Sequence, residues 1–219
     1  MNSKEAIRIK KDIYKKQIEV PSVIDKASGI YILNYHIKSF IFTTDVVAIR
    51  NNNADAIMAV YPFTPQPILS RALSSVSNKP LFVGVGGGTT RGERVVKLAL
   101  NAEFIGVLGV VLNSPIDKET LKAVAEAVEI PVIASVVSVK QVAEKLSCGA
   151  DILNVCAGVD TIKQVKKIRS RFSGIPIIAT GGPTEKTIKK TIQAGANSII
   201  YTPPTITSLM RNLMEKYRK

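Results

Sequence analysis

The stretch Ile130-Pro131-Val132-Ile133-Ala134-Ser135 leads into a helical pattern and then into Gly149-Ala150-Asp151. The same order returns in Ile175-Pro176-Ile177-Ile178-Ala179-Thr180, a second helical pattern and Gly195-Ala196-Asn197. In each copy a proline opens a short apolar run, a helix follows, and a Gly-Ala pair precedes the next run. Such repetition is typical of a strand-helix-strand unit reused around a parallel sheet. The repeat therefore predicts an α/β fold.

Eight short apolar runs with turn residues at their ends divide the chain outward from this repeat. Most are separated by segments whose apolar residues recur every three or four positions, as on one face of a helix. Because parallel strands need crossover connections, we predict a single (β/α)8 TIM barrel over residues 1–219. The predicted strands are residues 30–35, 56–61, 81–85, 105–112, 132–136, 152–155, 177–180 and 198–201. The clearest predicted helices are residues 94–102, 118–128, 139–146, 161–172, 185–194 and 206–217.

The N-terminal part of the chain is predicted to lie outside the barrel. Residues 1–19 read as an additional helix, so residues 1–28 are interpreted as a helical extension. This segment lacks the apolar core of a signal peptide, and no apolar run approaches the roughly 20 residues that span a bilayer. With only two cysteines, Cys148 and Cys156, we expect a soluble cytoplasmic protein. The conformation of residues 36–44 is left open between strand and irregular loop.

The formal net charge of +13 raises the question of nucleic-acid binding. The lysines are spread in pairs over predicted outer helices, which favours a solvated basic surface and makes nucleic acid an unlikely partner. A positive field also attracts a phosphorylated metabolite. We expect a small anionic metabolite as the partner, no membrane and no metal or cofactor, and a homo-oligomer is left open.

Candidate binding residues lie where the predicted strands end, because TIM barrels build their active sites there. Thr180, Gly181 and Gly182 precede a helix, and glycines let backbone amides approach an anion at a helix N-terminus. Thr202 and Thr205 follow the last strand and can close the other side of the same site. The alternative is that the two glycines only make a tight turn.

A second glycine cluster follows the third predicted strand. Gly86 and Gly87 can cradle an anion, with Arg91 as a charge clamp, but a lid or tight turn fits the same residues. Asn113 and Asn154 stand at two other strand ends and are predicted to contact the ligand. These two glycines, the arginine and the two asparagines complete the predicted binding set.

His36 and Lys38 follow the first predicted strand and are the candidate catalytic residues. A histidine there can act as a general acid or base, and a desolvated lysine can act as a base or form a Schiff base. The alternative for His36, the only histidine, is a packed or exposed ring without a catalytic role.

Several other polar or restricted positions receive structural interpretations. Cys156 is interpreted as a small buried residue, because no histidine is near it in the sequence to lower its pKa. Asp55, Asp151 and Asn197 begin strands and are assigned to the stability face. The proline-rich segment 61–67 is either a rigid wall beside the mouth or a stiff helix start with Pro67 in the first turn.

The C-terminal third, with Ile177-Ile178-Ala179-Thr180-Gly181-Gly182 and Gly195-Ala196-Asn197-Ser198-Ile199-Ile200, resembles the phosphate-binding (β/α)8 barrels. These include thiamine-phosphate synthase, N-acetylmannosamine-6-phosphate epimerase, indole-glycerol-phosphate synthase and the KDPG (keto-deoxy-phosphogluconate) aldolases. The resemblance implies a substrate phosphate held by the loops after strands seven and eight. The chain departs from these families in two places: Tyr201-Thr202-Pro203-Pro204 stands where they have a Gly-Ser or Gly-Ala pair, and the segment 152–156 lacks the aldolase lysine. The segments 61–67 and 86–88 are interpreted as marks of a distinct subfamily.

Together these features favour an enzyme that binds a small phosphorylated or anionic metabolite, with lyase or isomerase chemistry by proton transfer next to a carbonyl. The scarcity of carboxylates at the strand ends supports an alternative, a metabolite-binding barrel without turnover. A hydrolase is a further alternative, disfavoured because neither a metal cluster nor a Ser-His-Asp set is recognisable.

Overall fold

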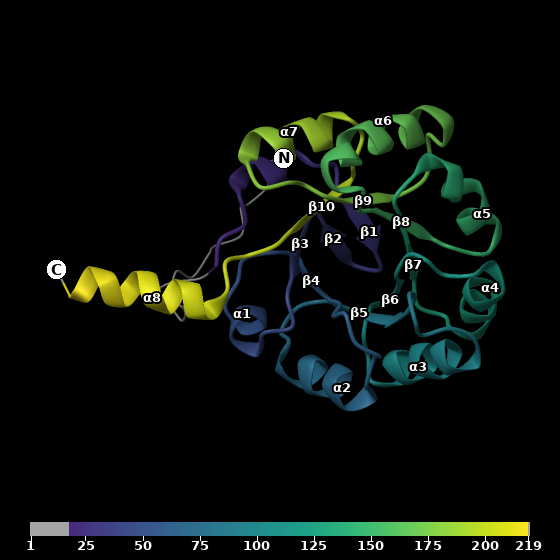
Figure 1. The fold of residues 1–219 in the computed structure, drawn as a ribbon, viewed down its shortest axis with the longest axis horizontal. Coiled ribbons are helices and arrows are strands. Elements are labelled where there is room, and N and C mark those ends of the chain that lie inside the picture. The colour runs from purple at the N-terminus through teal and green to yellow at the C-terminus, as the bar shows by residue number, and fades with distance from the viewer. Residues whose placement is uncertain (1–17, 219) are drawn as a thin grey trace, which may run out of the picture.

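The computed structural model describes residues 18–218, in which eight parallel strands close into a barrel in the order β10-β3-β4-β5-β6-β7-β8-β9 (Figure 1). The fold class predicted from the sequence is therefore confirmed. The barrel strands are β3 (Ser39–Phe42), β4 (Ala56–Ala59), β5 (Leu81–Gly86), β6 (Gly109–Leu112), β7 (Val132–Val136), β8 (Ile152–Val155), β9 (Ile177–Thr180) and β10 (Ser198–Tyr201). The α-helices are α1 (Val46–Arg50), α2 (Pro67–Val76), α3 (Glu93–Phe104), α4 (Lys118–Ala127), α5 (Val142–Ser147), α6 (Thr161–Arg171), α7 (Glu185–Gln193) and α8 (Ile206–Tyr217), and the 3-10 helices are η1 (Ser22–Lys26), η2 (Val139–Gln141) and η3 (Gly158–Asp160).

The first predicted barrel strand, residues 30–35, is wrong. That segment begins an antiparallel hairpin of β1 (Ile30–Ile32) and β2 (Tyr35–Ile37). The first barrel strand is β3, which falls in the segment whose conformation was left open. Alternation of buried and exposed residues in β1 is typical of a hairpin covered on one face, whereas β3 is buried along most of its length.

The barrel interior is filled by large apolar side chains from every strand. Phe40 and Phe82 pack edge to face with ring centroids 5.2 Å apart. Ile30, Ile32 and Ile37 of the hairpin join this same cluster, so the hairpin closes the barrel at the end where the strands begin. The other fully interior residues are Ala56, Met58, Val111, Ile133, Ile152, Ile178 and Ile200.

The polar residues that begin the strands hold neighbouring strands in register. The Asp151 carboxylate accepts a hydrogen bond from the backbone amide of Val132 at 2.8 Å, and the Asn197 side chain accepts one from Ile177 at 2.9 Å. Asp55 in the same way accepts from the amide of Ser39 at 2.9 Å. Each side chain thus satisfies the free amide at the start of the preceding strand, which confirms their assignment to the stability face.

Polar side chains and glycines mark several helix ends. Asp45, Ser138 and Thr184 accept hydrogen bonds from backbone amides at the starts of α1, η2 and α7. Gly149 and Gly195 follow helices with positive φ angles of 90° and 111°. Asp160 precedes α6, but its side chain makes no capping bond to that helix.

The two ends of the described chain depart from a regular barrel. Most of the predicted N-terminal helix lies outside the described residues, but η1 packs on α7 and buries Ile24 against Ile188 and Ile199. Helix α8 begins and ends as predicted, yet it projects away from the barrel, and none of its side chains is buried (Figure 1). η1 packs beside α7, and α8 does not complete the ring of helices (Figure 1). Within residues 18–218, no helix combines the length and hydrophobicity needed to cross a bilayer.

Candidate functional site

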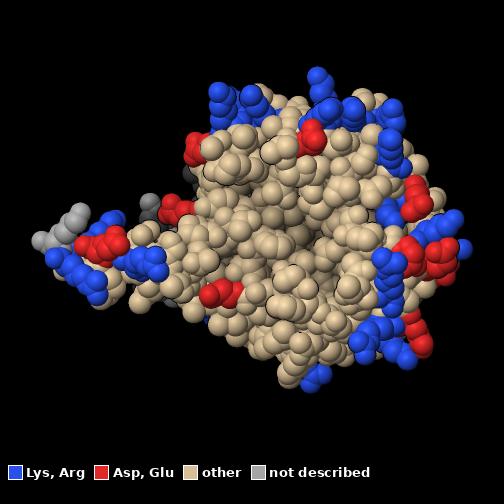
Figure 2. Space-filling view, in the orientation of Figure 1, with Lys and Arg blue, Asp and Glu red and all other residues tan. Residues whose placement is uncertain are grey.

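The candidate site is the hollow at the carboxyl ends of the barrel strands. In Figure 1 the strands follow one another counterclockwise, and because the crossovers are right-handed, their carboxyl ends face the viewer. Figure 2 shows this face hollowed at its centre and surrounded by uncharged residues, whereas Lys and Arg gather over α6 and α7 and around the outer edge. Few charged side chains therefore lie at the mouth itself on this face.

The inward-pointing positions become small and polar toward the mouth. Alternation along β8 places Asn154 on the same side as the interior residue Ile152, one layer nearer the mouth. Ser135 of β7 lies opposite Asn154 in the register, and Thr180 is the inward residue at the end of β9. Ser135 is 2% exposed and Asn154 is 7% exposed. An apolar interior thus ends in a polar layer.

Asn154 and Ser135 are hydrogen-bonded in this layer, and Cys156 lies near them. The Asn154 side-chain amide donates from Nδ2 to Ser135 Oγ at 3.0 Å. The Cys156 thiol faces the Val136 carbonyl oxygen at 3.9 Å. Burial raises the pKa of the Cys156 thiol and outweighs the opposing effect of the Ser135 hydroxyl. The thiol is therefore protonated and poorly nucleophilic at neutral pH, although Cys156 is partly buried and not the fully buried residue that was expected.

We expect Cys156 to react slowly with iodoacetamide at pH 8, and its rate to keep rising above pH 9. A raised pKa leaves less thiolate at any given pH, and the thiolate is the nucleophile. Mass spectrometry of the peptide that contains Cys156 measures the rate, with the unfolded protein in urea as reference. The Cys148→Ser variant removes the other thiol. A rate at pH 8 equal to that of the unfolded chain contradicts this reading.

A pocket with a volume of about 260 Å³ opens beside this layer, at the ends of β4, β5 and β6. Tyr61 and Phe63 form one wall, and the Tyr61 hydroxyl is fixed by accepting a hydrogen bond from the Gln66 amide at 2.8 Å. Pro67 lies in the first turn of α2, so the proline-rich segment both borders the mouth and starts a helix. The pocket is lined by Tyr61, Pro62, Phe63, Pro65, Gly84, Gly86, Gly87, Gly88, Thr89, Thr90, Asn113 and Ser114.

Two glycines of this pocket, Gly86 and Gly87, are required by close packing. A Cβ at Gly86 would lie 2.5 Å from the Val95 side chain, and one at Gly87 would lie 2.1 Å from the backbone oxygen of Asn113. Arg91, predicted as a charge clamp, is exposed and donates from Nε to the Gly88 carbonyl at 3.0 Å. Gly86, Gly87 and Asn113 are thus brought together in one pocket, and Arg91 braces its loop instead of lining it.

The predicted phosphate loop lies on the opposite side of the mouth. Gly181 is buried between Ile188 and Ile199, and its amide bonds to the carbonyl of Ile200 at 3.3 Å. Gly182 has a φ of 86°, and its amide donates no hydrogen bond to any part of the chain that the structure describes. Backbone amides in the first turn of α7 and of α8 are partly occupied, since Thr184 and Thr205 cap them through their side chains. Thr202 is exposed between β10 and α8.

His36 and Lys38 lie at the opposite end of the barrel from the mouth, so their predicted placement is wrong. The His36 ring stacks on Tyr31 with centroids 4.3 Å apart, and its Nε2 lies 2.7 Å from the carbonyl oxygen of Ser28. Lys38 donates from Nζ to the carbonyl of Asp25 at 2.8 Å, just before β3 begins. Because residues 30–37 form the closing hairpin, neither side chain can reach a ligand in the mouth, and we do not retain them as catalytic candidates.

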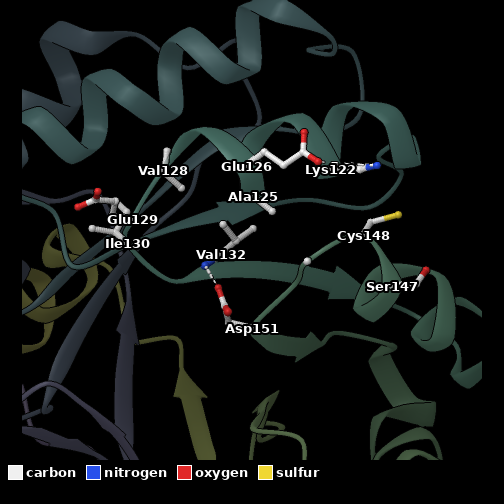
Figure 3. A pocket seen from close by; sticks show the side chains of 11 residues that line it. Lys122, Ala125, Glu126, Val128, Glu129, Ile130, Val132, Ser147, Cys148 and Asp151 are labelled. Carbon is white, nitrogen blue, oxygen red and sulfur yellow. Dashed lines mark hydrogen bonds and ion pairs between the residues drawn. The ribbon is translucent and has the colours of Figure 1, made fainter.

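A larger cavity of about 360 Å³ lies between α4, α5 and the starts of β7 and β8 (Figure 3). Figure 3 shows the Asp151 carboxylate turned to the backbone amide of Val132, while Cys148, Glu126 and Lys122 border the outer part. The carboxylate is thus committed to the strand register, and this cavity lies at the stability end. Among residues 18–218, no three His, Cys, Asp or Glu side chains are placed to hold a metal ion.

Two residues of the mouth were missed by the sequence reasoning. Gly84 occupies an inward position of β5 and lines the pocket. The alternation of inward and outward residues along the strand could have predicted this position. Gln141 accepts from the amides of Val137 and Ser138 and donates to Ser114 Oγ at 3.4 Å, which joins the loops after β6 and β7. Its role depends on a contact between loops far apart in the chain, and no local pattern predicts it.

Comparison with known proteins supports the fold and names no family. No model of a known protein family matches the chain, and no curated protein matches it in sequence. Among solved structures, a phosphonopyruvate hydrolase complex with oxalate and Mg²⁺ is similar with a TM-score of 0.65 and 15% identity, over 82% of this chain and 80% of that chain. A 2,3-dimethylmalate lyase is similar with a TM-score of 0.64 and 16% identity, over 90% of this chain and 85% of that chain. A thiamine phosphate pyrophosphorylase from Pyrococcus furiosus is similar with a TM-score of 0.59 and 21% identity, over 75% of this chain and 84% of that chain. The chain thus shares the TIM-barrel fold of these enzymes, as the resemblance predicted.

Proposed function

We propose that this protein is an enzyme that binds a small anionic or phosphorylated metabolite at the carboxyl end of its barrel. The observation that carries the proposal is the polar layer of Ser135, Asn154 and Thr180 above an apolar interior, beside the pocket of about 260 Å³. Polar groups at the strand ends of a TIM barrel are typical of a substrate site.

The anion is assigned to the loop after β9. The Gly182 amide, which has no partner among residues 18–218, and the N-terminus of the nine-residue α7 offer positive partial charge. The net charge of +13 attracts anions over a longer range. The finer proposal is lyase or isomerase chemistry, in which a proton moves next to a carbonyl. Within residues 18–218, the groups described at the polar layer are neutral, so they would orient the substrate and stabilise charge by hydrogen bonds.

The test is isothermal titration with a panel of small phosphorylated metabolites, together with product analysis by mass spectrometry. We expect binding to weaken about tenfold in Thr180→Val, which removes one mouth hydroxyl with little change in shape. Lys38→Ala, at the far end of the barrel, is the matched control and should bind as the unchanged protein does. Binding that is lost in Lys38→Ala and kept in Thr180→Val places the site elsewhere and contradicts the proposal.

A metabolite-binding barrel without turnover is the second candidate, and the protonated Cys156 favours it. Acid–base catalysis generally needs two groups with separated pKa values, and the Asn154, Ser135 and Thr180 side chains do not titrate in the working range. Binding of a metabolite that is recovered unchanged after prolonged incubation selects this candidate. Repeated turnover selects the enzyme.

A further inference from the structure

The side-chain amide of Asn154 has one hydrogen-bonding atom without a partner. Nδ2 is used by Ser135, but Oδ1 has no partner among residues 18–218, although the residue is 93% buried. Buried polar groups in folded proteins are nearly always hydrogen-bonded, so an unpaired oxygen at a candidate site indicates that a ligand supplies the missing donor. The position at the inward end of β8 aims this amide toward the mouth.

The hydrogen bond between Asn154 and Ser135 leaves an acceptor as the free atom. The amide nitrogen Nδ2 of Asn154 donates to Ser135 Oγ at 3.0 Å. The atom of the same amide that has no partner among residues 18–218 is the carbonyl oxygen Oδ1. A carbonyl oxygen can only accept a hydrogen bond, so its partner must be a donor.

We infer that Asn154 selects a ligand whose inner end carries a hydrogen-bond donor, a hydroxyl or an amine, and rejects an anionic inner end. This inference rests on the proposed function, because it assumes that the ligand enters the mouth. A phosphate or carboxylate oxygen next to Oδ1 would be repelled, whereas a hydroxyl or amine donates a hydrogen bond to it. The substrate class is then a metabolite with its anion at the Gly182 side and a hydroxyl or amine at the Asn154 side.

The chemistry of the neighbouring pocket agrees with this orientation. Its lining consists of glycines, prolines, two aromatic residues, hydroxyls and the amide of Asn113, with no ionised side chain. An uncharged part of the ligand fits there without a desolvation penalty for unpaired charge. Oδ1 is shielded from solvent in this structure, so a ligand that reaches it moves side chains, as is common on binding.

The test compares glycerol 3-phosphate with propyl phosphate, which carries the same anion on the same three-carbon chain but lacks both hydroxyls. Isothermal titration should show that the unchanged protein binds glycerol 3-phosphate about tenfold more tightly. In Asn154→Leu this ratio should fall to near one, through weaker binding of glycerol 3-phosphate alone. Asn212→Leu makes the same substitution on the exposed surface of α8 and should leave the ratio unchanged.

Each other result overturns a definite part of the argument. Equal binding of both phosphates to the unchanged protein, or a ratio that survives in Asn154→Leu, overturns the role of Asn154 and leaves the proposed function standing. Failure of the unchanged protein to bind either phosphate, or any phosphorylated metabolite of the panel, overturns the proposed function and this inference with it.

A stability measurement distinguishes a ligand-binding role of Asn154 from a purely structural one. The double variant Ser135→Ala/Asn154→Leu removes both hydrogen-bonding partners, which is nearly neutral or stabilising when shape is kept. We expect its thermal midpoint to equal or exceed that of the unchanged protein. A clearly lower midpoint shows that the polar pair is needed for folding and overturns the inference.

Discussion

Replacing Arg169 with methionine is expected to lower the free energy of unfolding by about 4 kcal/mol, because several acceptors, most of them partly buried, lose a charged donor at once. From α6, Nε and Nη2 donate to the carbonyl of Gly195 at 3.1 and 2.8 Å, and Nη2 also donates to the Asn197 side chain at 2.7 Å. Nη1 donates to the carbonyls of Ser173 and Ile175 at 2.6 and 2.9 Å. One guanidinium thus joins α6, the start of β9 and the start of β10.

Burial lowers the pKa of the Arg169 guanidinium, yet an arginine remains charged at neutral pH. Methionine keeps much of the aliphatic packing and removes every donor, so the loss reports the hydrogen bonds. Urea unfolding followed by circular dichroism gives the value. Arg171→Met, on an exposed position of the same helix, is the control and should change stability by less than about 0.5 kcal/mol. Equal effects of the two substitutions would contradict the bridging role.

Replacing Gly87 with alanine should cost about 3 kcal/mol of stability and close the pocket between β4 and β6. Gly87 has a φ of 105°, and a Cβ there would meet the backbone oxygen of Asn113 at 2.1 Å. Backbone cannot move aside as a flexible side chain does. The loop is also held at Gly88, whose amide donates to the carbonyl of Pro115 at 2.8 Å. The methyl group therefore forces the β5 and β6 loops apart.

Gly88→Ala is the matched control for this prediction. Gly88 also has a positive φ, 64°, but a Cβ there meets nothing within 4 Å. Its cost should be limited to the backbone preference of about 1 kcal/mol. Thermal and urea unfolding measure both variants, and titration with the phosphorylated panel measures the site. Similar losses in the two variants would show that backbone strain, and not the contact with Asn113, governs this loop.

The glycine cluster shows that one sequence pattern can have two structural causes. Gly86 and Gly87 were predicted to cradle an anion or to make a turn. In the structure, close packing leaves no room for a Cβ at either position, and both residues line the pocket. Asn154 was predicted from its position at the end of an apolar run. That its side-chain oxygen has no partner among residues 18–218 follows only from the arrangement of β7 and β8. The binding roles of these residues stay predictions.

The sequence alone determined the repeating α/β units, seven of the eight barrel strands and the bounds of α8 from Ile206 to Tyr217. These features follow from backbone geometry, since periods of two and of three to four residues are set by strand and helix themselves. Only the tertiary structure decided that residues 30–37 form the closing hairpin, that His36 faces away from the mouth, and that α8 leaves the ring. A local sequence pattern indicates that one face of a helix or strand is apolar. Which part of the protein covers that face depends on contacts between residues far apart in the chain.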